Sequence, residues 1–324
     1  VQGFQWADYT VHSGTRYRYR VVPTCGTPKH LVLDDAQSAT VEVLTEMEGD
    51  MPEEGRTRHD VFFNRGVIGS QAYAREFGNR TPDENDPGSP EMKWLSRGLF
   101  EALLRFIGLA KDGFGLRAAV YEFHYQPVVN AFARAVEAGA DVKIIYDAED
   151  AYKADNQAAI AAAGLDAAGA AIPRTVTEGI RHNKFIVLLQ GEEPVAVWTG
   201  STNISAGGIF GHSNVGHIAW DPAIAREYLE YWKRLEKNPT PTKLAKPNRT
   251  ANPTPAGKIG EHSTYALFSP RDAKDSVETL QWYADRMGEA KEIACLTVAF
   301  NLDEVFQQVV SRENDVLRYL VKDD

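Results

Sequence analysis

Arg-His-Asn-Lys-Phe-Ile-Val-Leu-Leu at 181–189 and Gly-Ser-Thr-Asn at 200–203 are the two stretches that decide the predicted fold. The apolar run that closes 181–189 predicts a buried strand, and Val-Ala-Val-Trp-Thr at 195–199 predicts another. The turn formers Gln-Gly-Glu-Glu-Pro at 190–194 predict that the second strand returns beside the first. We therefore expect 200–203 to lie next to the beginning of the first strand.

Polar side chains suited to phosphate chemistry gather at this predicted edge. Residues two apart on a strand share a face, so we expect His182 and Lys184 to point the same way. The apolar side chains expected on the opposite face are Phe185, Val187 and Leu189. Ser201 and Asn203 add a hydroxyl and a carboxamide to the imidazole and the ammonium. Lys and Asn donate hydrogen bonds to phosphoryl oxygens, and a neutral His can attack phosphorus, so the pattern predicts a phosphate site.

The spacing of these residues resembles the signature of the phospholipase D superfamily, which is His-x-Lys, four residues, Asp, then Gly-Ser and a nearby Asn. The matching residues are His182, Lys184, Gly200, Ser201 and Asn203. The resemblance implies a two-step displacement at a phosphodiester of a phospholipid or nucleic acid, with no metal and no cofactor. One His would form a phosphohistidine, and a second His would protonate the leaving group. This chemistry assigns catalysis to His182, Lys184 and Asn203, and phosphate binding to Gly200 and Ser201.

Two carboxylates of the family pattern are missing. Leu189 stands where the Asp would fall, and Gly216 stands where members often carry a Glu that orients the His. Loss of an orienting carboxylate can lower the rate by orders of magnitude, because the His then populates the wrong tautomer. We therefore expect this half-site to be catalytically weak or purely phosphate-binding.

Three further residues are candidates for supporting roles. Glu122, in a predicted strand, could supply the missing orienting carboxylate. His124, near the end of that strand, could line the substrate cleft, because strand ends carry sites in α/β folds. His217 begins an apolar run, where a packed His that caps a strand is the stronger alternative to a catalytic one.

Helical and strand patterns along the chain predict an α/β fold. We expect a mixed β-sheet flanked by helices, in two pseudo-duplicated phospholipase D-like halves. The predicted parts are a β-rich segment at 1–50, the first half at 59–237, an extended proline-rich linker at 238–258 and the beginning of the second half at 259–324. The Tyr-rich strand within 1–50 resembles the last strands of a fibronectin type III-like sandwich.

The predicted duplication rests on a repeated spacing. Phe132 and Phe306 are 174 residues apart, as are Asp141 and Asp315, and each pair follows similar predicted elements. Members of the family usually carry two His-x-Lys motifs. A counterpart of His182 is expected at about position 356, on a strand hairpin beyond the printed sequence.

Composition and charge exclude several classes of protein. Hydrophobic residues make up 43% and charged residues 25%, and no run approaches the roughly 20 apolar residues of a membrane-spanning helix. The net charge of -10 argues against bulk, non-specific DNA binding. Cys25 and Cys295 form no disulfide or zinc pattern and predict two separate buried thiols. A soluble, cytoplasmic protein is favoured, but a leader before Val1 could already have been removed, so secretion stays open.

Three functions follow from these features. The first is a phospholipase D-like phosphodiesterase that is weakly active alone, because the chain holds one of two motifs, unless a homodimer pairs two copies of His182. The second is a non-catalytic phosphate or nucleic-acid binding module with a degenerate site. The third is a nuclease of the same superfamily, and the acidic charge argues mildly against it.

Overall fold

The chain divides into two compact units, Val1–Glu54 and Gly55–Asp324. The computed structural model describes residues 11, 14–27, 29–45, 49–53, 55–149, 151–298 and 301–322.

The first unit contains two antiparallel pairs of strands. The pairs are β1 (Arg16–Val21) with β4 (Ala39–Leu44), and β2 (Thr24–Thr27) with β3 (His30–Leu33), followed by a 3-10 turn at Asp35–Gln37. Tyr17 and Tyr19 stack at 6.1 Å, and Arg18 pairs with Glu42 across the strands at 2.6 Å. None of the described residues between 14 and 45 is buried, so the fibronectin type III-like resemblance stays a prediction. Residues 1–10 of the predicted β-rich segment lie outside the described residues.

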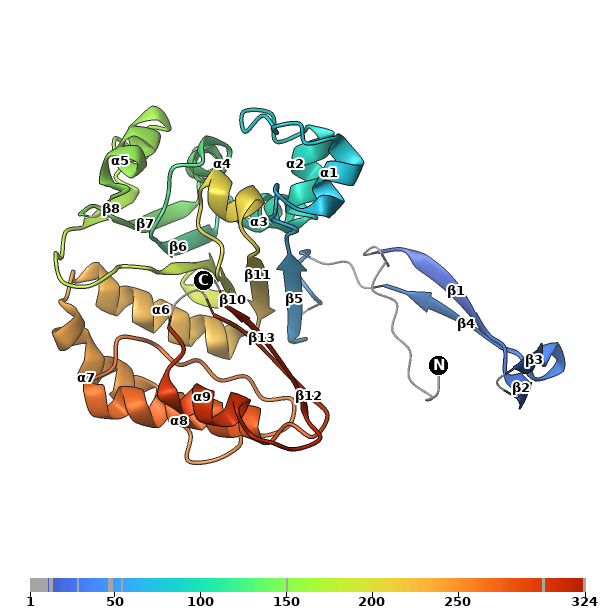
Figure 1. Ribbon diagram of the computed structural model, residues 1–324. Coiled ribbons are helices and arrows are strands. Elements are labelled where there is room, and N and C mark those ends of the chain that lie inside the picture. The colour runs from blue at the N-terminus through green and yellow to red at the C-terminus, as the bar shows by residue number, and fades with distance from the viewer. Residues whose placement is uncertain are drawn as a thin grey trace. The chain divides into compact units, whose positions relative to one another are not determined.

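The second unit is built around a seven-stranded mixed sheet in the order β5-β11-β10-β9-β6-β7-β8 (Figure 1). The neighbours β6, β7 and β8 are parallel, and the other neighbouring pairs are antiparallel. In sheet order the strands span Arg58–Phe63, Val215–Trp220, Glu193–Gly200, Lys184–Gln190, Phe114–Val120, Asp141–Asp147 and Ala171–Arg174. The predicted mixed sheet of an α/β fold is confirmed.

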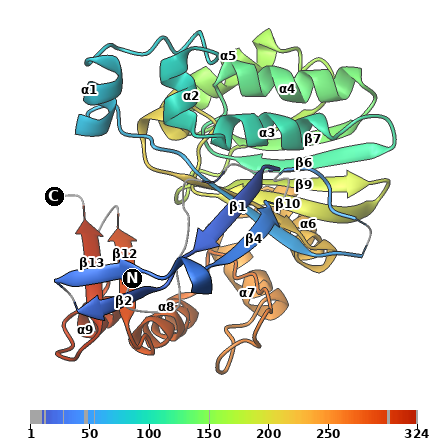
Figure 2. The same cartoon turned by 90° about the vertical axis from the view of Figure 1, so that its right-hand side faces the viewer.

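Helices cover both faces of this sheet (Figures 1 and 2). One apolar cluster contains Phe106 of α3, Phe132 of α4 and Ile186 of β9, whereas the other contains Val187 of β9 and Trp232 of α6. Successive residues of β9 thus face opposite layers, as the sequence predicts. The helices around the sheet span Gln71–Phe77 (α1), Pro90–Ser96 (α2), Leu99–Gly108 (α3), Gln126–Glu137 (α4), Lys153–Ala162 (α5), Pro222–Glu236 (α6) and Pro241–Ala251 (α7), with a π-helical turn at Gly207–Gly211.

The predicted extended conformation of the linker at 238–258 is wrong, because helix α7 lies within it. Thr240 caps the helix by accepting a hydrogen bond from Lys243 N at 3.3 Å. Pro241 occupies the first turn, where a missing N–H costs nothing. Leu244 is 2% exposed and belongs to the apolar cluster of α6. The prolines favour an extended chain by composition, but one of them begins a helix.

An order of elements in the first half occurs again after α7. Helix α8 (Ala273–Gly288), β12 (Ile293–Val298), α9 (Glu304–Val310) and β13 (Leu317–Lys322) follow the order of α3, β6, α4 and β7. In both cases the two strands are parallel neighbours. A shared origin of the two regions stays a prediction. The sequence predicts that β12 extends to Phe300, and its last two predicted residues lie outside the described residues.

Both cysteines are exposed, so the prediction of two buried thiols is wrong. Cys25 and Cys295 lie in two-stranded sheets, β2-β3 and β12-β13. Within the described residues, no helix is both long and apolar enough to cross a bilayer. In the same part of the chain, no three His, Cys, Asp or Glu side chains gather in a way that could hold a metal ion.

Candidate functional site

The segments that carry the predicted site meet at the end of β6 and the beginning of β9. Val120, the last residue of β6, pairs with Lys184, the first residue of β9. The residues that follow β6 therefore lie beside those that precede β9. A bridge between Phe123 and Ile204 brings the loop after β10 to the same place.

His182 and Lys184 come together around the ring of Tyr121. The His182 ring meets Tyr121 edge to face, with centroids 4.8 Å apart, and Lys184 Nζ lies 5.6 Å from the centre of the same ring. Lys184 Nζ also donates to the backbone carbonyl of His182 at 3.2 Å. Because β9 begins only at Lys184, strand alternation does not place His182, and the expected shared strand face is wrong for it. Tyr121 joins the two side chains instead.

The surroundings favour a neutral imidazole at pH 7. Part of His182 is exposed, but desolvation of the rest lowers its pKa, and the charge of Lys184 lowers the pKa further, whereas the carboxylate of Glu122 raises it. Burial lowers the pKa of Lys184 to about 8, although Glu122 opposes this shift. A neutral imidazole keeps the lone pair that a nucleophile or a base requires.

Glu122 and Asn203 form a hydrogen-bonded pair within this group. Asn203 Nδ2 donates to Glu122 Oε1 at 2.5 Å, and the Glu122 carboxylate interacts electrostatically with both His182 and Lys184. The buried Asn203 Oδ1 has no hydrogen-bond partner in the described part of the chain. The structure therefore gathers the predicted His182, Lys184, Glu122 and Asn203, and their catalytic roles stay predictions.

Gly200 and Ser201 hold the loop after β10 against β11. Gly200 has φ of 138°, and a Cβ there would lie 2.2 Å from Val215 O, so this close approach requires glycine. Ser201 Oγ donates to Asn214 Oδ1 at 2.8 Å and accepts from Val215 N at 3.1 Å. These bonds explain a structural need for Gly-Ser, and the phosphate-binding role of both residues stays a prediction.

The other two predicted histidines lie in different places. His124 stacks on Tyr152 at 5.6 Å, and Tyr152 meets Tyr121 at 5.5 Å, so His124 is connected to the group through aromatic rings. His217 is not brought to it. His217 Nε2 and His59 Nδ1 share a hydrogen bond of 2.9 Å. Ala219, which shares a face of β11 with His217, packs in the apolar cluster of α6. His217 therefore lies on the sheet face opposite to Ile186.

The positions of the two missing carboxylates are filled by apolar packing. Leu189 is 4% exposed within the apolar cluster of α6. A Cβ on Gly216 would lie 2.3 Å from the indole of Trp198. A carboxylate fits neither position without moving its neighbours.

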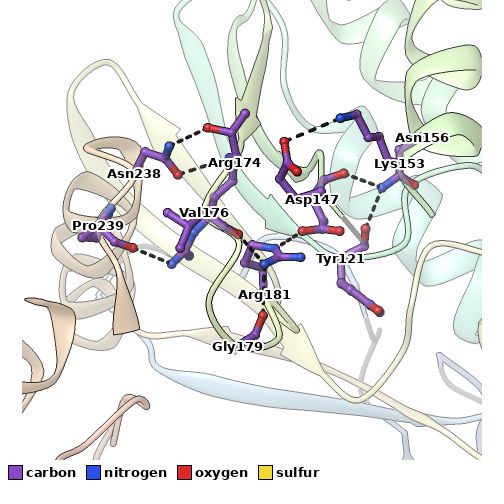
Figure 3. A network of polar contacts seen from close by, with 12 residues as sticks. Tyr121, Asp147, Lys153, Asn156, Arg174, Val176, Gly179, Arg181, Asn238 and Pro239 are labelled. Carbon is purple, nitrogen blue, oxygen red and sulfur yellow. Dashed lines mark hydrogen bonds and ion pairs between the residues drawn. The ribbon is translucent and has the colours of Figure 1, made fainter. Parts of the chain in front are cut away.

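A buried polar network beside His182 is not apparent from the sequence (Figure 3). Arg181 Nε donates to the carboxylate of Asp147, and its Nη1 donates to the carbonyls of Val176 and Gly179. Arg181 and Asp147 are 6% and 1% exposed. They are separated by 34 residues, so no local spacing reveals the pair. Their common signal is that each lies at a strand end, next to a predicted strand.

Asn156 connects this network to the end of β6. Its Oδ1 accepts from Phe123 N at 2.6 Å. Its Nδ2 donates to Tyr121 O at 2.8 Å and to Asp147 O at 3.0 Å (Figure 3). These three bonds fix the backbone on both sides of Glu122. The network thus positions Tyr121 and Glu122, and the bonds of Arg181 anchor the chain directly before His182.

Two cavities adjoin these residues. The smaller, of about 10 Å³, is lined by Glu122, Lys184 and Thr202 among others, and has room for about one water molecule. The larger, of about 310 Å³, is lined by His182 and Asn183 on one side and by residues of α7 on the other.

The seven-stranded mixed sheet with helices on both faces makes the second unit an α/β domain, and the group around Tyr121 is its candidate site. Residues 103–236 match the family model described as cardiolipin synthase, PLD-like domain. This part of the chain is a phospholipase D-like domain. No curated protein matches the chain.

Several solved structures are similar to the chain. One is Nuc from Salmonella typhimurium, a phospholipase D family member, with 24% identity over 55% of this chain and 93% of that one, at a TM-score of 0.38. Another is phosphatidylserine synthase from Haemophilus influenzae Rd KW20, with 13% identity over 67% of this chain and 57% of that one, at a TM-score of 0.44. A third is polyphosphate kinase from Porphyromonas gingivalis, with 13% identity over 69% of this chain and 36% of that one, at a TM-score of 0.46.

Proposed function

We propose that this chain is a phospholipase D-like phosphodiesterase with His182 as its nucleophile. A ring nitrogen of His182 attacks phosphorus, the P–N bond forms, and the P–O bond to the leaving group breaks. Water then attacks the phosphohistidine, which restores the free imidazole and releases a phosphomonoester. Each step needs an acid or a base besides His182, because the leaving oxygen takes up a proton and the attacking water gives one up.

The observation that carries this proposal is the meeting of His182 and Lys184 on Tyr121. Desolvation keeps the imidazole neutral, which a nucleophile needs, while Lys184 remains largely protonated below a pKa of about 8. Its ammonium would neutralise charge on the phosphoryl oxygens. Glu122 would orient the group in place of the carboxylates that are missing at Leu189 and Gly216, and the Asn203 amide would turn from Glu122 to the phosphate when substrate binds.

The acid, and then the base, would be the His182 of another copy of the chain in a homodimer, where the negative charge of the bound phosphodiester would favour the protonated imidazole of that second copy. The printed sequence holds one His-x-Lys motif. We therefore expect the chain to show slow turnover that depends on self-association and is unaffected by EDTA.

The test is a single-turnover reaction with bis(p-nitrophenyl) phosphate. The expected result is release of p-nitrophenol and a covalent p-nitrophenylphosphoryl adduct on the peptide that contains His182, detected by mass spectrometry. His182→Asn should abolish both, and the exposed His262→Asn, whose left-handed backbone suits Asn, should retain both. Equal turnover by His182→Asn and by the unchanged chain contradicts the proposal.

A non-catalytic phosphate-binding module is the second candidate function. The packing of Leu189 and of Gly216 favours this function. A site that lacks the carboxylates that orient its histidine loses catalytic rate but can still bind phosphate. Anion binding that requires Lys184, with no adduct on His182 at any protein concentration, would identify this function instead.

A further inference from the structure

The larger cavity lies beside the candidate nucleophile but on a different side from Lys184. His182 and Asn183 line it together with Arg174, Tyr231 of α6 and Leu244 of α7. Lys184 and Glu122 instead line the small cavity. At about 310 Å³ the larger cavity has the size at which ligand pockets begin, roughly 300 Å³.

Arg174 is a buried cation without a carboxylate partner. It ends β8, beside Asp147 at the end of β7, and it is 6% exposed. Its Nη2 donates to the carbonyl of Pro239 at 3.3 Å, as Figure 3 shows. Its Nε is buried and has no hydrogen-bond partner among the described residues, and no ion pair involves it there. Buried charges in proteins are normally paired, so this guanidinium lacks an anion.

The neighbouring charges do not supply that anion. The Asp147 carboxylate accepts from Arg181 Nε, so this pair is already neutral. Glu178 is the one carboxylate among the described residues that line the cavity, and its side chain is exposed. Asn183 Nδ2 donates to the Tyr231 hydroxyl at 3.2 Å, and that hydroxyl donates to Ser269 O at 2.8 Å. The cavity therefore keeps a net positive wall at Arg174.

We propose that this cavity is a second anion site, in which Arg174 binds a phosphate group next to the one that His182 attacks. A guanidinium offers paired N–H donors that match phosphate oxygens, and the carboxyl ends of parallel strands are where α/β folds bind ligands. The natural ligand would then carry two phosphate groups. Its role as a substrate subsite rests on the proposed function, whereas anion binding in the cavity does not.

In the experiment, inorganic phosphate and dimethyl phosphate are titrated separately into the whole chain at matched ionic strength. Calorimetry measures the affinity, and methyl NMR locates the binding. Phosphate should shift the methyl signals of Ile180 and Leu244, which line the cavity, and leave Ile144 in the apolar core unchanged. Tighter binding of inorganic phosphate would identify a terminal phosphate, and tighter binding of dimethyl phosphate an internal diester. If neither ligand shifts the methyl signals of Ile180 and Leu244 in the unchanged protein, the proposal is wrong.

Two variants separate this site from the proposed reaction site. Arg174→Met should weaken phosphate binding in the cavity by about tenfold or more, because it removes charge-assisted hydrogen bonds. It should not lower the melting temperature without ligand, since it replaces an unpaired buried charge by an apolar side chain. Lys184→Ala should leave the Ile180 and Leu244 shifts intact while it removes adduct formation on His182. Unchanged phosphate affinity in Arg174→Met overturns the second site and leaves the proposed function standing.

Discussion

Three cations near the candidate site differ in how far nearby carboxylates neutralise them, and this difference decides which of them can bind an anion. Arg181 is neutralised by the buried carboxylate of Asp147 and serves the fold. Lys184 lies over the Tyr121 ring with Glu122 nearby, and burial lowers its pKa to about 8. Arg174 has no carboxylate partner among the described residues. Only the last two retain positive charge that a ligand can use.

The lowered pKa of Lys184 predicts a pH dependence of anion binding. A base whose pKa is lowered loses its proton, and hence its charge, as the pH rises through about 8 rather than through its ordinary value of 10.5. Sulfate stays a dianion throughout this range, so its affinity should fall by up to about tenfold per pH unit above pH 8. Calorimetric titrations at pH 7, 8 and 9 measure this decrease.

Lys184→Arg is the matched control for that titration. A guanidinium stays charged at all three pH values, so this variant should bind sulfate with nearly constant affinity. Any binding at Arg174 contributes equally to both proteins. A pH profile that is the same in both would mean that Lys184 does not contact the anion.

At the scale of elements, the sequence predicts β9 and β10 but misses the outer strands β5 and β8 and the polar contacts between distant segments. The apolar run after Lys184 indicates β9, because a continuous hydrophobic segment of five residues needs two covered faces. The sequence does not predict helix α7, because the high proline content of 238–258 favours an extended chain. Pro241 nevertheless suits the first turn of a helix.

The sequence likewise predicts the part of the candidate site that local spacing encodes and misses the part formed by distant segments. His182 and Lys184 share a short motif, and Asn203 follows the returning strand, so local spacing reveals them. Asn156 and Asp147 act through contacts between distant segments, which no spacing encodes. The loop before Lys184 shows the same limit, since Tyr121 rather than strand alternation brings His182 to the lysine.

Asn156 is expected to hold β6 and β7 together at their carboxyl ends. Asn156→Ala removes three hydrogen bonds to the backbone, at Phe123 N, Tyr121 O and Asp147 O, and two of these bonds involve fully buried atoms. Unsatisfied buried polar groups cost about 1–3 kcal/mol each, so we expect the free energy of unfolding to fall by about 2–5 kcal/mol. Urea unfolding measures the change.

Gln157→Ala provides the comparison on the same helix. Gln157 is exposed, so its removal should change the free energy of unfolding by less than about 1 kcal/mol. Similar stability of the Asn156→Ala and Gln157→Ala variants would show that the three hydrogen bonds of Asn156 do not stabilise the site.

At the scale of the whole molecule, the number of histidines available for catalysis determines the expected kinetics. The fold supplies one His-x-Lys motif, at the end of a sheet whose order of elements occurs once more in α8, β12, α9 and β13. Among the described residues, His217 bonds with His59 and does not contact the group around Tyr121. A two-histidine reaction by residues 1–324 then requires two copies of the chain.

Subunit mixing tests this requirement. If two copies of His182 act together, a dimer of one unchanged chain and one His182→Asn chain is inactive. An equal mixture should then show about half the activity per unchanged chain, because random pairing puts half of those chains into mixed dimers. Specific activity should also rise with protein concentration over the range in which sedimentation velocity shows dimers forming. Mixing with His262→Asn should leave activity additive. Activity that stays additive with His182→Asn as well, and does not depend on concentration, means that a single chain completes the reaction and that its second acid and base lie elsewhere in the same subunit.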